Sequence, residues 1–212
     1  MIKQNKLKLI ITSIIILLPI LAGIILWDKL PAEIPTHFDI NGNPDQYSSK
    51  AFTVFFFPLF LLFIHWVCMI GTSIDPKKKN ITKKPITLVL MICPVISILI
   101  HTIMYLYALG IKVDVPVIMC LFIGVVFIIV GNYLPKCRQN YTIGIKIPWT
   151  LNDEDNWNKT HRFAGVLWTI AGFIFLATAF LGNFWIFLPL VLIMVIVPMI
   201  YSYILHKKKE DK

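Results

Sequence analysis

Charged residues are scarce in this chain, since Asp, Glu, Lys and Arg make up only 15% of its 212 residues. Hydrophobic residues make up 58% and the mean hydropathy is +0.77, which is more apolar surface than a soluble core of this length can bury. The sequence also lacks a glycine-rich nucleotide-binding loop. The composition excludes a soluble domain and predicts an integral membrane protein. The lack of a nucleotide-binding loop counts against a nucleotide-driven pump.

Six apolar runs are each long enough to cross a bilayer as a helix, which takes about 20 residues. They cover residues 9–27, 51–71, 85–107, 115–134, 163–181 and 184–205. We therefore predict an all-α integral membrane protein, a bundle of six transmembrane helices that forms a single membrane domain over residues 1–212. Its two substantial loops are an outer loop at 28–50 and an inner loop at 135–161.

The basic residues predict the orientation, because Lys and Arg that flank spans are retained on the cytoplasmic side. Only Lys29, Lys50 and Lys112, three of the 20 basic residues, fall on the side opposite the N-terminus. We expect both termini in the cytoplasm of a multi-pass protein of the cell membrane. The net charge of +9 follows from this topology and from attraction to anionic lipid, and it requires no direct binding of nucleic acid.

No Asp, Glu, Lys or Arg lies inside the six runs. Ion-coupled transporters usually carry an ionisable residue at that depth, so its absence counts against ion coupling. The two span histidines, His65 and His101, are expected to bond to neighbouring helices. The four cysteines have no CxxC spacing and are expected to be packing residues, so the sequence predicts neither a metal site nor a cofactor.

Glycines recur every seven residues on two of the runs. Gly124 and Gly131 lie on the fourth run, and Gly165 and Gly172 lie on the fifth. Small residues let helix backbones approach closely in a membrane. The fourth and fifth helices are therefore predicted to pack against each other.

The outer loop reads DKLPAEIPTHFDINGNPDQYSSK. Its three prolines exclude a regular helix and Asn41-Gly42 is a turn signal, so we predict an extended segment folded back by a tight turn. Alternating oxygen-bearing residues from Asp39 to Asp45 mimic the start of a calcium loop, but Pro44 and Lys50 replace the Gly and Glu that such a loop requires, which favours a plain turn. Acidic residues outnumber basic ones here and favour a cationic or amphipathic ligand. The candidate ligand-binding residues are His37, Phe38, Asp39, Asp45 and Tyr47.

The inner loop, PKCRQNYTIGIKIPWTLNDEDNWNKTH, is the longest loop of the chain. Its second half predicts a helix start, with Thr150 or Asn152 as cap and three acidic residues in the first turn. We expect this helix to continue into the fifth span. Along it, Asp155 would pair with Lys159, and Trp157 would share a face with His161. Trp157 and Trp149 are expected to lie in the lipid interface.

Two other functions remain open from the residues alone. Asp153, Glu154, Asp155 and His161 could serve a membrane-embedded enzyme as an acid/base or metal cluster, although no nucleophile motif accompanies them and helix-dipole compensation is favoured. The second alternative is a transporter or flippase for a peptide or lipid. Its path would be lined by spans that proline kinks, at Pro58, Pro94, Pro189 and Pro198.

Both loops resemble known sequence elements. LPAEIPTHFDINGNPDQYSSK is similar to a hairpin element of unknown function near the start of many small bacterial membrane proteins, and GNYLPKCRQNYTIGIKIPWTLNDEDNWNKTHRFAG resembles the signature of the SdpI family. The signature positions are Asn140, Gly144, Pro148, Trp149, Thr150, Leu151, Trp157, Thr160, His161, Arg162 and Gly165.

This resemblance implies a six-span, non-enzymatic protein of the bacterial cell membrane. Such a protein protects its producer from a secreted, membrane-active peptide toxin, and it can also signal by holding a cytoplasmic DNA-binding repressor at the membrane. The implied partners are membrane lipids, the toxin and that repressor. The outer loop would capture the peptide, and the inner loop would transmit, scaffold or dock.

Overall fold

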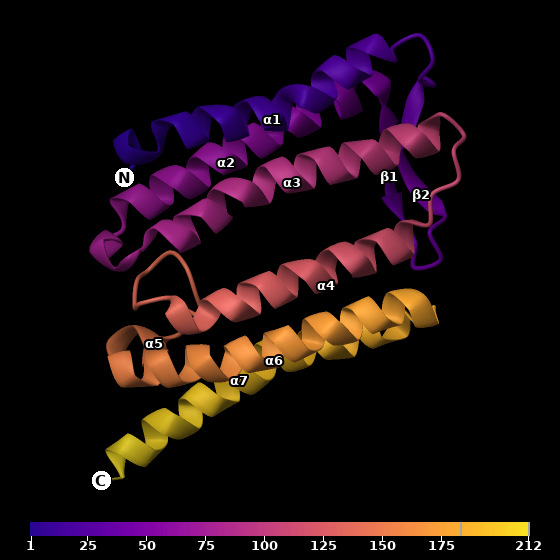
Figure 1. Ribbon diagram of the computed structural model, residues 1–212. Helices are drawn as coiled ribbons and strands as arrows, with labels where there is room; N and C mark the ends of the chain where they lie inside the picture. Colours follow the sequence, from indigo (N-terminus) through magenta and orange to yellow (C-terminus); the bar gives the residue numbers. More distant parts are fainter. Residues whose placement is uncertain (183, 212) are drawn as a thin grey trace. The chain divides into compact units, whose positions relative to one another are not determined.

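The computed structural model describes residues 1–182 and 184–211. Within them, six helices are long and apolar enough to cross a membrane, which confirms the predicted helical membrane fold. The six are α1 (Lys6–Ile25), α2 (Phe57–Ile74), α3 (Lys83–Ala108), α4 (Val115–Tyr133), α6 (Glu154–Leu181) and α7 (Phe187–Glu210). The loops add a short helix, α5 (Pro148–Asn152), and two strands, β1 (Glu33–Phe38) and β2 (Pro44–Ser49) (Figure 1).

The chain forms two compact units. Residues Met1–Ile74 and Ile86–Val115 make up the first, here called the hairpin unit, and residues Asp75–Pro85 and Pro116–Lys212 make up the second, the loop unit. The connection between α2 and α3 therefore belongs to the loop unit, together with α4 to α7.

Polar groups pair inside the helices of the hairpin unit. Thr12 Oγ1 lies 2.9 Å from His65 Nε2, which confirms the expected bond between His65 and a neighbouring helix. His101 instead bonds to its own helix, with Nδ1 2.7 Å from the carbonyl oxygen of Ser97. Ser97 Oγ donates to the carbonyl oxygen of Ile16 at 2.8 Å and links α3 to α1. Such bonds satisfy polar groups that cannot hydrogen-bond to water inside the lipid bilayer.

The outer loop folds into a β-hairpin, as its turn signal predicts, and lies at the ends of α1 and α3 (Figure 1). A cluster of buried residues fixes it there: Leu30, Ile34, Val54, Met104 and Tyr105. Lys50 adds a polar anchor, because its ammonium donates to the carbonyl oxygens of Trp27 (2.8 Å) and Leu30 (3.1 Å). The same ammonium lies 4.7 Å from the centre of the Trp27 ring.

Helices α4 and α6 of the loop unit approach each other at their glycines. A Cβ atom on Gly131 would lie 2.8 Å from the carbonyl oxygen of Gly165, and one on Gly172 would lie 2.7 Å from that of Gly124. Both positions are closer than real Cβ contacts, so the predicted packing of these helices is confirmed. Helix α7 packs on α6 through a cluster that contains Phe175 and Met194.

Candidate functional site

Asp39 builds the turn of the outer hairpin. Its Oδ1 accepts the backbone N–H groups of Asn41 (2.9 Å) and Asn43 (2.7 Å), and Gly42 supplies the positive φ of 82°. The hydrogen bond from the Asn43 backbone is the main reason that the pKa of Asp39 lies below its ordinary value. Asp39 is therefore a charged turn residue.

The other candidate residues of the outer loop lie on the two strands. His37 Nδ1 and Asp45 Oδ1 are 2.6 Å apart, and both residues are exposed, as is Tyr47. Phe38 instead packs edge-on against Tyr107 of α3, with ring centres 5.2 Å apart. The structure thus presents His37, Asp45 and Tyr47 on the surface and uses Phe38 to attach the hairpin to a helix.

Asn140 shapes the first turn of the inner loop. Its side-chain oxygen accepts the N–H groups of Thr142 (2.9 Å) and Ile143 (2.7 Å). Its side-chain nitrogen donates to the carbonyl oxygens of Arg138 (2.8 Å) and Ile143 (3.0 Å). Both donors of this buried amide are therefore used within the loop itself.

The ring of His161 fixes the middle of the inner loop to α6. Its Nδ1 lies 2.8 Å from the carbonyl oxygen of Trp157, and its Nε2 accepts the N–H of Ile145 at 2.9 Å. A carbonyl oxygen can only accept, so Nδ1 carries the proton and the imidazole is neutral. The rings of His161 and Trp157 are stacked with centres 4.0 Å apart, which confirms that they share a face.

Gly144 lies against these two rings. Its φ is 126°, a conformation that side chains other than hydrogen rarely tolerate. A Cβ atom here would lie 2.9 Å from the ring of Trp157 and would also collide with the ring of His161. Both the backbone conformation and the lack of space therefore require glycine at position 144.

The two tryptophans of the inner loop have different environments. Trp157 is completely buried, and its Nε1 donates to the carbonyl oxygen of Cys137 at 2.7 Å. The expectation that Trp157 lies in the lipid interface is therefore wrong, because the preceding loop folds over it and supplies its hydrogen-bond acceptor. Trp149 is only partly buried, and its ring contacts those of Tyr203 (5.1 Å between centres) and His206 (6.2 Å) on α7.

Helix α5 begins at Pro148, whose missing N–H is not needed in a first helical turn. Thr150 holds this helix to the loop, since its hydroxyl donates to the carbonyl oxygen of Ile145 at 2.7 Å and accepts the N–H of Ile147 at 3.2 Å. The side chain of Gln139 then donates to the carbonyl oxygen of Thr150 at 2.8 Å. These bonds join the two halves of the inner loop.

The interpretation of the sequence missed Asp75, which follows α2. Its buried carboxylate accepts the N–H groups of Lys77 (2.7 Å) and Tyr141 (2.9 Å) and the hydroxyl of Thr142. Lys77 in turn donates from its ammonium to the side-chain oxygen of Gln139. The connection between α2 and α3 is therefore bound to the inner loop. A single Asp between an apolar run and a cluster of lysines was the available signal.

We expect Asp75→Asn to lower the free energy of unfolding by about 1–3 kcal/mol. The carboxylate accepts three hydrogen bonds, and in the variant an NH₂ group would face some of the same N–H and O–H donors. Asp155→Asn is the matched control, since Asp155 is an exposed partner of Lys159 and such pairs contribute about 0–1 kcal/mol. Thermal unfolding in detergent, followed by tryptophan fluorescence, measures both. Equal melting temperatures for the two variants would contradict a stabilising role for Asp75.

Asp153 caps α6, and its Oδ1 accepts the N–H of Asp155 at 3.0 Å. The predicted caps were wrong, because Thr150 and Asn152 belong to the separate helix α5. The predicted continuation into the fifth span is confirmed, since α6 runs without a break to Leu181.

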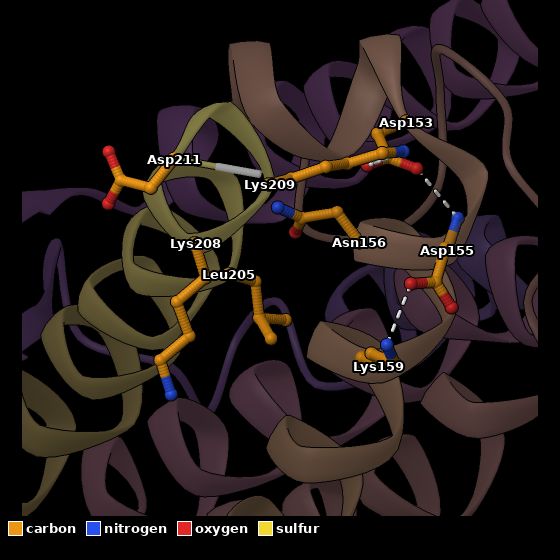
Figure 2. Close-up of a pocket in the computed structure, with 8 residues that line it drawn as sticks. All are labelled: Asp153, Asp155, Asn156, Lys159, Leu205, Lys208, Lys209 and Asp211. Carbon is orange, nitrogen blue, oxygen red and sulfur yellow. Dashed lines mark hydrogen bonds and ion pairs between the residues drawn. The ribbon is translucent and has the colours of Figure 1, made fainter.

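A cavity of about 510 Å³ lies between the start of α6 and the end of α7 (Figure 2). It is lined by Asp153, Asp155, Asn156, Lys159, Leu205, Lys208, Lys209 and Asp211. One ion pair crosses it, as Lys209 of α7 donates to Asp153 at 2.9 Å, and a second lies along α6, where Lys159 donates to Asp155 at 2.7 Å as predicted. The hydrogen bond from Lys209 is the main reason that the pKa of Asp153 lies below its ordinary value.

This cavity does not assemble the cluster that an enzyme would need. His161 does not line it, and the two nitrogens of that ring are bonded to the backbone of Ile145 and of Trp157. Among the residues that the structure describes, no group of three or more His, Cys, Asp or Glu side chains is placed to hold a metal ion. Asp153 acts as the cap of α6 and as the partner of Lys209, and Asp155 acts as the partner of Lys159.

The remaining signature residues lie on α6. Thr160 is buried and donates to the side-chain oxygen of Asn156 at 3.0 Å. Ser202 of α7 donates to the same oxygen at 2.6 Å, and the Asn156 amide donates back to the carbonyl oxygen of Ser202 at 2.9 Å. Arg162 is exposed. The first turns of α6 are thus fixed to α7 by a closed polar network.

Comparison with known protein families gives two matches, and each covers one of the two loops. Residues 136–202 match the model of the SdpI/YfhL protein family, and residues 14–62 match that of a domain of unknown function, DUF1648. The chain is 33% identical over 209 residues to "Immunity protein SdpI" of Bacillus subtilis (strain 168), which covers 95% of this chain and 97% of that relative. No solved structure gives a significant match. With six candidate spans, this multi-pass membrane protein belongs to the SdpI family, as its loop motifs predicted.

Proposed function

We propose that this protein makes the bacterium that produces it immune to a secreted, membrane-active peptide toxin. One observation carries the proposal: 33% identity to an immunity protein over 95% of the chain. The ranges matched by the two family models contain the outer hairpin and nearly all of the inner loop. The similarity therefore includes the elements on which recognition of a peptide would depend.

The outer hairpin is the proposed point of contact with the peptide. Asp45 and Glu33 are exposed, and the hydrogen bonds to Asp39 keep that carboxylate charged. The ammonium of Lys50 is bound to backbone carbonyl oxygens at the base of the hairpin. The strands therefore present a mainly anionic surface, with Tyr47 as an exposed aromatic residue, and such a surface attracts a cationic peptide.

The proposed role of the inner loop is to support the bundle and not to catalyse a reaction. Asn140, Thr150 and His161 use their hydrogen-bonding groups within the loop and on α6. A general acid or base must instead be free to exchange a proton with a substrate. The structure supports a pre-organised scaffold on this side of the membrane, and hence a binding protein rather than an enzyme.

A cytoplasmic partner is a further part of the proposal. The resemblance supports a DNA-binding repressor that the protein would hold at the membrane. Arg162 is exposed and Trp149 is partly exposed, so both are available for such a contact. Co-purification of a candidate repressor with the wild-type chain, but not with Arg162→Ala, would support this role, and equal recovery with both would contradict it.

Survival of a sensitive bacterium under the cognate peptide tests the immunity function. We expect the wild-type chain to protect, and Asp45→Asn and Tyr47→Ala to lower the tolerated toxin concentration by about tenfold, as a loss of about 1.4 kcal/mol of binding would do. Gln46→Ala is the matched control, because Gln46 is an exposed residue of the same strand that carries neither a charge nor a ring. Full protection by both variants would contradict capture by the hairpin. Failure of the wild-type chain to protect would contradict the function itself.

A further inference from the structure

A groove runs between α4 and α6 of the loop unit. Its volume of about 360 Å³ falls within the range of small-ligand sites. Gly131 and Gly165 line it at the point where the two backbones touch. Contact between the glycines explains the packing of the helices, but it does not explain the open space beside them.

The two ends of the groove differ in polarity. At the end of α4, where the apolar span stops, the groove is lined by Asn132 and by Lys136, both exposed. Along α6 it is lined by Val166, Ile170 and Phe173, which are 59%, 54% and 59% exposed. Seven residues of helix separate Val166 from Phe173, a rise of about 10 Å. The groove therefore leads from the Lys136 ammonium at the edge of the span to an apolar wall at the depth of the lipid hydrocarbon.

We propose that this groove is a binding site for one anionic phospholipid. The phosphate group would accept a charge-assisted hydrogen bond from Lys136, and one acyl chain would lie over Val166, Ile170 and Phe173. Of the described residues that line the groove, none is acidic, and the Lys136 ammonium lies over the ring of Tyr133, 5.5 Å from its centre. The charge at one end and the apolar wall at the other match the two parts of a phospholipid. The site does not depend on the proposed immunity function.

Native mass spectrometry of the full-length protein in detergent tests this site, with phosphatidylglycerol and phosphatidylcholine of equal chain length as probes. We expect one phosphatidylglycerol to be retained per chain at a concentration at which phosphatidylcholine is lost. Lys136→Gln should weaken phosphatidylglycerol binding by about tenfold or more, because it removes the charged donor. Ile170→Trp should weaken the binding of both lipids by filling the apolar part. The control Lys78→Gln removes an exposed lysine of the same unit outside the groove and should bind as the wild type does.

Four results would overturn the proposal. Equal retention of the two lipids would show ordinary contact with bulk lipid. Unchanged phosphatidylglycerol binding by a folded Lys136→Gln or Ile170→Trp variant would place the lipid elsewhere. If inorganic phosphate raised the melting temperature as much as phosphatidylglycerol does, the acyl chain would not be required. Two chains per particle, with loss of lipid on association, would assign the groove to self-association.

Discussion

Trp157→Ala is expected to lower the free energy of unfolding by about 3–5 kcal/mol, the range for removal of a large aromatic side chain from a core. Trp157 is completely buried, so its loss leaves a cavity. It also leaves the carbonyl oxygen of Cys137 without its indole donor and the ring of His161 without its stacked neighbour. Thermal unfolding in detergent and the amount of protein in the membrane measure the effect.

Trp149→Ala is the matched control for this prediction, because it removes the same side chain from the same loop. Trp149 is only partly buried and contacts the rings of Tyr203 and His206, contacts that contribute about 1 kcal/mol each. We therefore expect a clearly smaller loss of stability and a normal amount of protein. If Trp157→Ala melted at the same temperature as Trp149→Ala, the buried position of Trp157 would be refuted. Reduced protection by a stable Trp149→Ala protein would point to a direct role for Trp149.

Gly144→Ala is expected to produce the second large effect, a loss of protection together with a loss of stability. A Cβ atom would collide with two rings, and φ of 126° is strained for alanine. The rings cannot move aside without breaking the bonds of His161 to Ile145 and Trp157. Survival under toxin and the melting temperature of the same variant should therefore fall together.

Gly110→Ala separates strain from collision. Gly110 also has a positive φ, 78°, but nothing lies within 4 Å of the Cβ position. Alanine there should lower stability only by the left-handed penalty of about 1–2 kcal/mol. A variant Gly144→Ala that is no less stable than Gly110→Ala would show that the inner loop adapts to the side chain.

Features that depend on neighbours in the sequence could be predicted. The turn at Asn41-Gly42, the pairing of Asp155 with Lys159 and the shared face of Trp157 and His161 all follow from local spacing. The approach of α4 and α6 followed from glycine spacing. In each case the residues that meet are close in the chain or repeat with the period of a helix, so their proximity requires no knowledge of the rest of the fold.

Features that depend on distant residues could not be predicted. Spacing places Trp157 on a face of α6, but it does not show that Cys137, 20 residues earlier, covers that face. The acceptor role of Asp75 depends on Tyr141, 66 residues away. Thr150 has the chemistry of a helix cap for α6, and only the backbone path shows that it lies within α5, where its hydroxyl bonds to Ile145 and Ile147. These contacts arise from the path of the loop, which no local pattern contains.

The bond between Ile145 and His161 also has a kinetic consequence. The Ile145 amide proton is held by a ring nitrogen instead of a carbonyl oxygen, so it cannot reach water until the imidazole turns away. That rotation also breaks the bond to Trp157 and the stack between the rings. Opening of the inner loop should therefore occur as one concerted event, and the amide of Ile145 should exchange with solvent only through that event.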